Sequence, residues 1–273
     1  MIFSACGDSG TGGTGSGELQ VTTWGEDYIE NNIPASAFED GYSVKYAKFM
    51  IVLGNIKIAD HSGDVGATMS GQKVFDMTLK GPHQVQDFKN IGAKRWDRVS
   101  IEVKPAGADT QAGNDIDAKD LALMKDNGYS FYVQGEMTKG QSSKTFSWGF
   151  SLSTEYKECQ RAPEDGGEVG VSVPDGGTAV LQFTIHGDHL FYDDLASPDA
   201  VLRGDAIFSS DKDQDGKITM DELDSVDLSS LPENEYGTGG APDVYTLADF
   251  VKALSRTVVH FQGEGHCHSH VED

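Results

Sequence analysis

The sequence predicts a mainly β protein with an α-helical C-terminal part, in which an antiparallel β-sandwich precedes a short helical module. Short segments rich in β-branched and aromatic residues recur at intervals of roughly 10–20 residues between positions 19 and 185, as is typical of sandwiches. No alternation of strands with long helices accompanies them, which argues against a nucleotide-binding α/β sheet. After Ile185 helix-capping residues and an acidic loop predict the helical module.

The chain of 273 residues is longer than one average domain, and changes in composition divide it into four parts. Residues 1–18 form an N-terminal segment with a Gly/Ser/Thr-rich flexible tether. Residues 19–185 form the β-sandwich, 186–265 the helical module and 266–273 a His-rich tail.

Strands of the sandwich are expected where apolar alternation is bounded by Gly, Pro or polar turns. The clearest alternation runs over residues 96–103, and Pro105 ends it. Residues 84–89 fit either a turn of helix or the end of a strand, and 119–126 fit one helical turn. The expected strands cover 19–24, 44–53, 55–58, 74–79, 96–103, 129–137, 144–152, 169–173 and 178–185.

Helices are expected on both sides of the acidic loop. Ser197 and Pro198 suit the N-cap and first position of an entering helix that reaches Phe208. A short exiting helix is expected at 220–226. Thr246 then caps a further helix that runs to about residue 261.

The acidic loop runs from Asp211 to Glu222. Counted as twelve positions, it has carboxylates at positions 1, 3, 5 and 12 and Gly216 at position 6. Ca²⁺ prefers about six to eight oxygen ligands, which a tightly wound loop with a glycine at its turn supplies. Close carboxylates without a cation would repel one another. The predicted Ca²⁺ ligands are Asp211, Asp213, Asp215, the Lys217 carbonyl, Thr219 and Glu222.

This spacing resembles the calcium loop of EF-hand proteins. The resemblance implies an EF-hand-like helical module that holds Ca²⁺ as a structural ion, with Ile218 paired to a neighbouring hand. Thr246 and Asp249 fall at positions 9 and 12 of a second, degenerate hand. An ordinary amphipathic helix explains these two residues as well.

Composition excludes several classes of partner. The chain has 44 acidic and 21 basic residues, a formal net charge of −23. Nucleic acid and anionic lipid both require basic surfaces, so neither is an expected partner. No apolar run of about eighteen residues predicts a membrane span. The charge suits a secreted protein that meets cations.

A cysteine lies close to the N-terminus. Phe3, Ser4 and Ala5 precede Cys6, and a Gly/Ser/Thr-rich tract follows it. This pattern resembles the processing site of a bacterial lipoprotein, which implies a lipid on Cys6 and a protein anchored in the cell envelope, at the periplasmic side or the cell surface. The few residues upstream are shorter than a signal peptide, so a native start upstream of Met1 is expected. The alternative is a stray cysteine in a disordered tail.

Two cysteines remain, Cys159 and Cys267. In an oxidising compartment they are most simply a disulfide. The alternative is that Cys267 is a metal ligand.

Eight histidines are unevenly placed, with one pair where the sandwich ends and another group near the C-terminus. Both groups flank the helical module, so they could converge in space. Imidazoles grouped with Asp188 and Glu264 suit Zn²⁺ or Cu²⁺. The alternatives without an ordered metal site are a disordered His tail and histidines that only form capping hydrogen bonds where the sandwich meets the helical module. The candidate ligands are His186, His189, His260 and His266.

The segment from Phe146 to Phe150, Phe-Ser-Trp-Gly-Phe, lies upstream of Cys159 on an aromatic-rich strand region that ends near a histidine. In this it resembles periplasmic copper-binding β-sandwich proteins associated with methanobactin uptake. The resemblance covers about half of the sandwich and fixes no ligand.

Three functions follow. The first is a non-catalytic, calcium-binding lipoprotein of the cell envelope, and the second is a copper- or zinc-binding protein that uses the histidines. The third is a metal-dependent enzyme, although no Gly-x-Ser-x-Gly or His-Glu-x-x-His motif is present. The sequence names no protein partner.

Overall fold

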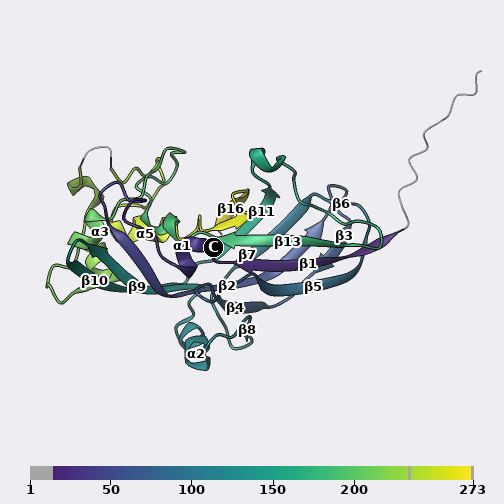
Figure 1. Cartoon of the computed structure of the whole chain (residues 1–273), viewed down its shortest axis with the longest axis horizontal. Coiled ribbons are helices and arrows are strands. Elements are labelled where there is room, and N and C mark those ends of the chain that lie inside the picture. The colour runs from purple at the N-terminus through teal and green to yellow at the C-terminus, as the bar shows by residue number, and fades with distance from the viewer. Residues whose placement is uncertain (1–14, 233–234, 272–273) are drawn as a thin grey trace, which may run out of the picture.

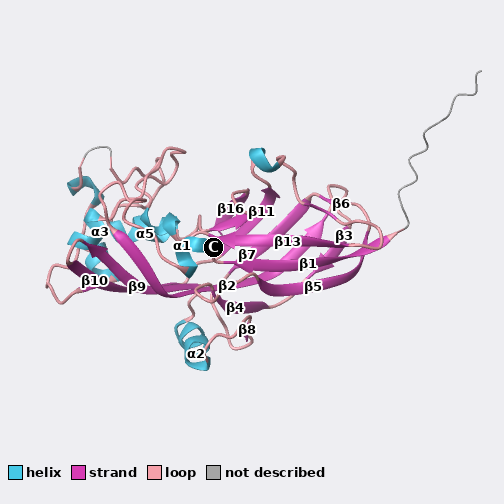
Figure 2. Cartoon of the chain, in the orientation of Figure 1, coloured by secondary structure: helices cyan, strands magenta, loops and turns pink. Residues whose placement is uncertain are grey.

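The computed structural model describes residues 15–232 and 235–271 (Figure 1). Strands make up most of its regular structure, and the helices are short (Figure 2). A four-stranded sheet and a curled ten-stranded sheet pack through one hydrophobic core. Leu19 and Phe183 enter this core from the smaller sheet, and Phe49 and Trp148 enter it from the larger one.

The four-stranded sheet has the order β15-β13-β1-β5. β1 runs parallel to β13, whereas β5 and β15 are antiparallel to their neighbours. The register of β13 with β15 places Thr184 opposite His260, so the C-terminal region folds back onto the end of β13. The strands are β1 Ser16–Trp24, β5 His83–Gly92, β13 Thr178–Ile185 and β15 Val259–Phe261.

The ten-stranded sheet has the main order β14-β10-β9-β2-β7-β11-β16, with β3, β4 and β8 attached through β2. β6 (Arg95–Trp96) and β12 (Val171–Ser172) form a separate pair. The strands of the large sheet are β2 Ser43–Ala59, β3 Val65–Thr68, β4 Gln72–Asp76, β7 Arg98–Val103, β8 Gln111–Ala112, β9 Phe131–Lys139, β10 Ser142–Phe150, β11 Thr154–Gln160, β14 Lys217–Ile218 and β16 His266–Val271.

Strand β2 is buried on both faces. Phe49 and Ile51 enter the main core, and the alternating residues Met50 and Val52 enter a second cluster with Met124 of helix α2 (Ala118–Asn127). Two covered faces explain why the sequence shows a continuous apolar run here instead of alternation. In Figure 1 α2 projects from the lower side of the larger sheet.

The other α-helices lie toward the opposite end from β6 and β3 (Figure 1). They are α1 Glu26–Glu30, α3 Asp205–Ser209, α4 Met220–Asp224 and α5 Leu247–Leu254. The 3₁₀ turns are η1 Pro163–Asp165, η2 Asp188–Phe191 and η3 Leu228–Ser230. None of the helices in the described part of the chain is long and apolar enough to cross a membrane.

The predicted fold class was wrong in its C-terminal half. The expected EF-hand-like helical module is not formed by residues 186–232 and 235–265, because α3 and α4 have only five residues each and β14 and β15 join the sheets. Of the expected His-rich tail, residues 266–271 form β16, which pairs with β11. The strictly antiparallel arrangement was also wrong, because β1–β13, β10–β14 and β4–β8 are parallel.

Local contacts explain why the entering helix is so short. The Asp194 carboxylate accepts hydrogen bonds from the backbone N–H groups of Ala196 and Ser197, which holds the expected helix start in a loop. Leu202 forms bridges with Phe38 and Tyr192. A helix therefore begins only after Gly204.

The bridge residue Ile218 finds its partner in the sheet and not in a second hand. It pairs in parallel with Phe146 of β10, and Trp148 Nε1 donates to the Ile218 carbonyl at 2.8 Å. Ile218 is completely buried. The acidic loop is thus fixed to the edge of the larger sheet.

Replacing Ile218 by Ala should destabilise the protein by about 2–5 kcal/mol, because the buried side chain leaves a cavity against β10. Urea unfolding measures this change in the free energy of unfolding. Val180→Ala is the matched control, since Val180 is 49% exposed and should change stability by less than about 0.5 kcal/mol. Equal effects of the two substitutions would contradict the docking of the loop.

Candidate metal centres

Three buried histidines meet where β13 ends. His186 follows β13 directly, His189 lies in η2 and His260 lies in β15. The His186 backbone N–H donates to the Val258 carbonyl at 2.9 Å, which extends the β13–β15 pairing by one step. Strand pairing therefore brings together side chains that are more than seventy positions apart.

The imidazole rings are in contact. The centroid of His260 lies 4.0 Å from that of His186 and 4.7 Å from that of His189, and 4.8 Å from that of His266. His186, His189 and His260 are 6%, 9% and 5% exposed, whereas His266 is exposed. We call the first three the histidine cluster, with His266 at its rim.

Close backbone packing fixes the segment that carries His186 and His189. Tyr46 donates its hydroxyl hydrogen to the Gly187 carbonyl at 2.5 Å. A Cβ at Gly187 would lie 2.6 Å from Ile29 and 2.8 Å from Tyr46, so only glycine fits between these two side chains.

The tautomer of His189 follows from its neighbour. Thr257 Oγ1 donates its hydrogen to the Leu254 carbonyl at 2.9 Å, so it can only accept from His189 Nδ1, at 2.8 Å. His189 therefore carries its hydrogen on Nδ1 and keeps a lone pair on Nε2. Such an outer hydrogen bond orients a metal-binding imidazole.

Two ring nitrogens of the cluster have no hydrogen-bond partner. His186 Nε2 and His260 Nδ1 are fully buried, and the nearest charged contact of His186 Nε2 is Glu26 Oε2 at 3.5 Å. Buried polar atoms normally form hydrogen bonds, and leaving one unpaired costs about 1–3 kcal/mol. A metal ion would use such lone pairs.

Carboxylates complete two overlapping groups that could hold a metal ion. Glu264 joins His186 and His260 in one group. Asp188 joins His186 and His189 in the other. In each group one ligand atom per residue lies within 4.8 Å of the others.

Burial keeps two imidazoles of the cluster in the neutral form, which is the form that binds metals. It lowers the pKa of His189 to about 3 and holds the pKa of His260 well below its usual range, with a further contribution from neighbouring histidines. Both imidazoles are therefore neutral at pH 7, as a metal ligand must be. Burial also raises the pKa of Glu26 and of Asp188.

Two pockets reach the cluster. A pocket of about 290 Å³ is lined by His186 together with Glu26, Asp27, Asp188 and Glu264. A second pocket, of about 520 Å³, is lined by His189, His260 and His266.

The acidic loop forms a separate group. Asp211, Asp213 and Glu222 each place a carboxylate oxygen within 4.8 Å of the others. Gly216 has a φ of +81° and donates its N–H to Asp211 Oδ2 at 3.2 Å. Lys144 Nζ lies 3.0 Å from the same oxygen, whereas Asp211 Oδ1 is buried without a hydrogen-bond partner.

The other predicted loop ligands have partners of their own. Asp215 accepts hydrogen bonds from the N–H and Nζ of Lys217, which hold its pKa below the usual value. Thr219 caps α4 and exchanges hydrogen bonds with Glu222. Lys217 itself pairs with Thr145 in the sheet.

Two of the three cysteines lie within the described residues. Cys159 and Cys267 form a disulfide, so Cys267 is not a metal ligand, and the bond attaches β16 to β11 next to His266. Cys6 lies outside the described residues.

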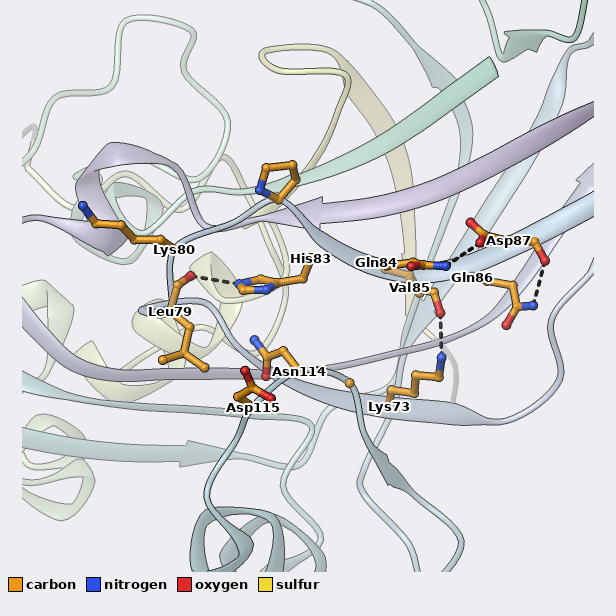
Figure 3. Close-up of a pocket in the computed structure, with 12 residues that line it drawn as sticks. Lys73, Leu79, Lys80, His83, Gln84, Val85, Gln86, Asp87, Asn114 and Asp115 are labelled. Atoms are coloured by element: carbon orange, nitrogen blue, oxygen red, sulfur yellow. Dashed lines mark hydrogen bonds between the residues drawn. The ribbon is translucent and has the colours of Figure 1, made fainter. Parts of the chain in front are cut away.

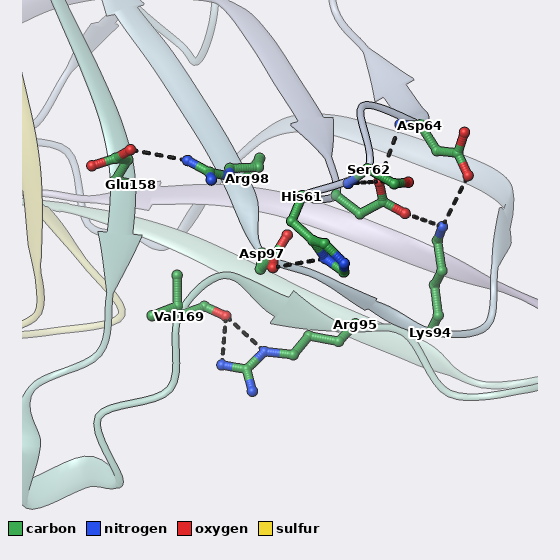
Figure 4. Close-up of polar contacts among 10 residues, drawn as sticks. His61, Ser62, Asp64, Lys94, Arg95, Asp97, Arg98, Glu158 and Val169 are labelled. Carbon is green, nitrogen blue, oxygen red and sulfur yellow. Dashed lines mark hydrogen bonds and ion pairs between the residues drawn. The ribbon is translucent and has the colours of Figure 1, made fainter. Parts of the chain in front are cut away.

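Three further histidines have contacts away from the cluster. His61 Nδ1 lies 3.3 Å from Asp97 Oδ2, in a surface region that also contains the ion pair of Arg98 with Glu158 (Figure 4). In the same region Nε and Nη2 of Arg95 donate to the Val169 carbonyl. His268 Nδ1 lies 3.3 Å from Glu158.

His83 belongs to a pocket of about 770 Å³ that opens beside β5 (Figure 3). Its Nε2 contacts the Leu79 carbonyl at 2.8 Å, and Lys73 Nζ donates to the Val85 carbonyl at 2.7 Å. His83 and Lys73 thus each have a backbone carbonyl as partner. Among the described residues, neither belongs to a group of side chains that could hold a metal ion.

Nothing in the sequence indicates that Glu26 and Thr257 lie beside the histidine cluster. Glu26 belongs to α1, which Figure 1 shows beside the tip of β13, more than 150 positions before His186. Thr257 follows α5 and looks like an ordinary helix-end residue. No local pattern marks either residue, because their roles arise from tertiary contacts alone.

Comparisons with protein-family models, curated proteins and solved structures find no match for this chain. The resemblances of the acidic loop, the N-terminus and the 146–150 segment to known families therefore stay predictions from the sequence.

The metal-free protein should lose stability as the pH falls from 7 to 5. Below pH about 6.5 the unfolded chain binds protons that buried His189 and His260 exclude, so each contributes a loss of up to about 1.4 kcal/mol per pH unit. Stability from these groups is complete above the unfolded pKa. Urea unfolding at several pH values, in chelator, measures the slope.

His260→Gln is the comparison variant, because Gln does not titrate. Its slope should be shallower than that of the original protein. The raised pKa values of Glu26 and Asp188 act in the opposite direction in both proteins, so the difference between slopes isolates His260. Identical slopes would show that His260 is not a buried neutral imidazole.

Proposed function

We propose that the protein binds a transition-metal ion, Cu²⁺ or Zn²⁺, through the histidine cluster. The observation that carries the proposal is the pair of buried ring nitrogens without partners, His186 Nε2 and His260 Nδ1, beside the free Nε2 of His189. Imidazole with carboxylate is a donor set that suits both ions.

A purely structural cluster is the competing explanation. Histidines that only fill a core normally satisfy their ring nitrogens with hydrogen bonds. Here three rings contact one another and two nitrogens remain unpaired. An ion held by His186, His260 and Glu264, which each offer a ligand atom within 4.8 Å of the others, would give the unpaired imidazoles a partner.

The acidic pocket provides a route for the ion. Glu26, Asp27 and Glu264 line it together with His186. Carboxylates around a partly enclosed opening concentrate cations near the site. This fits the formal charge of −23.

The disulfide supports a location in an oxidising compartment. Such bonds persist in secreted and periplasmic proteins and are rare in reducing cytosol. We therefore propose a location in the cell envelope, with a lipid anchor at Cys6 as the proposed means of attachment.

His260→Ala should weaken binding of Zn²⁺ by about 100-fold or more, since loss of even an outer-shell partner of a metal ligand costs roughly 10–100-fold. Isothermal titration of protein without a His tag, dialysed against chelator, measures the affinity. His61→Ala is the control, because the His61 side chain is 78% exposed and lies outside the cluster. The proposal fails if both variants bind Zn²⁺ as the original protein does.

A second ion, Ca²⁺, is proposed for the acidic loop. The specific observation is Asp211 Oδ1, which is buried and has no hydrogen-bond partner, within a group that includes Asp213 and Glu222. Lys144 neutralises the other oxygen of Asp211. Oxygen donors of this kind select Ca²⁺ and not the ions proposed for the histidines.

Calcium at about 10 mM should stabilise the protein by roughly 1–3 kcal/mol, if its affinity lies in the range of about 10⁻⁴–10⁻³ M typical of extracellular modules. A double variant, Asp211→Ala with Glu222→Ala, should lose this gain, whereas Asp109→Ala, at an exposed position, should keep it. Thermal unfolding with and without calcium measures the gain. An equal gain in the double variant would reject the site.

A further inference from the structure

The pocket of about 520 Å³ beside the histidine cluster is lined by one arginine. Arg256, which follows α5, lines it together with His189, His260 and His266. Arg256 is next in sequence to Thr257, whose hydroxyl orients His189. Arg256 and the candidate metal ligands thus line the same pocket.

Arg256 has no carboxylate partner among the described residues. Its side chain makes one long contact, from Nη1 to the Ser153 carbonyl at 3.5 Å. Its carbonyl accepts the Tyr156 hydroxyl hydrogen at 2.9 Å. Arginine remains charged at neutral pH, and with acidic residues outnumbering basic ones by 44 to 21 an unpaired guanidinium is unexpected.

The two carboxylates that line the pocket, Asp194 and Glu264, form no ion pair with Arg256. Asp194 Oδ1 accepts from the N–H groups of Ala196 and Ser197 at 2.8 and 2.7 Å. Glu264 places a carboxylate oxygen within 4.8 Å of ligand atoms of His186 and His260. Arg256 is therefore available to an anion from outside the described chain.

We propose that this pocket binds a small organic dicarboxylate. One carboxylate pairs with Arg256, and the other supplies an oxygen ligand to the ion in the histidine cluster. The planar fork of a guanidinium matches a carboxylate through two parallel hydrogen bonds. The pocket has the size of a small-molecule site, for which about 300–1,000 Å³ is usual.

The contact to Arg256 is independent of the metal, whereas the second contact rests on the proposed function. Succinate is the probe, because it is a weak chelator that should not remove the ion. Its binding is measured by isothermal titration to zinc-loaded and to zinc-free protein, each with Arg256 or with the Arg256→Gln substitution.

Zinc-loaded protein should bind succinate at least about tenfold more tightly than zinc-loaded Arg256→Gln, as expected for a charged hydrogen-bonded pair. The zinc affinity itself should be equal in the two proteins, which shows that the variant folds. Zinc-free protein should bind succinate more weakly than the loaded form and still lose affinity in the variant.

Equal succinate affinities of the original protein and the Arg256→Gln variant would overturn the proposal. So would equal binding of neutral succinamide, or tighter Arg256-dependent binding of inorganic phosphate than of succinate. Failure of the proposed metal function is seen separately, as the absence of saturable zinc binding before any succinate is added.

Discussion

The antiparallel pairing of β13 with β15 is the constraint on which the histidine cluster depends. It sets Thr184 opposite His260 and ties the backbone of His186 to Val258, so the two segments meet in one register. A shift of one residue would turn His260 to the other face of the sheet. The Cys159–Cys267 disulfide then holds β16 against β11, which keeps the rim of the cluster in place.

Two groups of donors with different chemistry arise from this framework. The histidine cluster is buried, and its His189 and His260 are neutral, so it suits an ion that prefers nitrogen ligands. The acidic loop is an oxygen site at the edge of the larger sheet, where Ile218 and Trp148 anchor it. In both groups at least one buried atom that could ligate a metal has no hydrogen-bond partner. A bound cation would remove the free-energy cost of that unpaired atom and would neutralise part of the negative charge of the chain.

The sequence was sufficient for the strands with strong alternation, and it named histidines and loop carboxylates that the fold brings together, among them Asp211, Asp213 and Glu222. The strand expected at 178–185 matches β13, and the His groups on either side of the acidic loop do converge. Strands β11 and β16 were not predicted, and β5 was left open between a turn of helix and the end of a strand, because these segments are polar or irregular and become strands only by pairing. The prediction of a C-terminal helical module was wrong for a related reason. The loop pattern specifies its own turn, but Phe146 of the sheet supplies the partner of Ile218, and Asp194 prevents the helix from starting early.

X-ray absorption spectroscopy of protein loaded with one equivalent of Cu²⁺ tests the central claim most directly. Because imidazole rings give characteristic outer-shell scattering, the account predicts a spectrum that requires two histidine ligands per copper, as in the group of His186, His260 and Glu264. The same spectrum should lose one imidazole in a His260→Gln variant. A copper environment of oxygen donors alone, without imidazole scattering, would show that the buried histidines do not hold the ion.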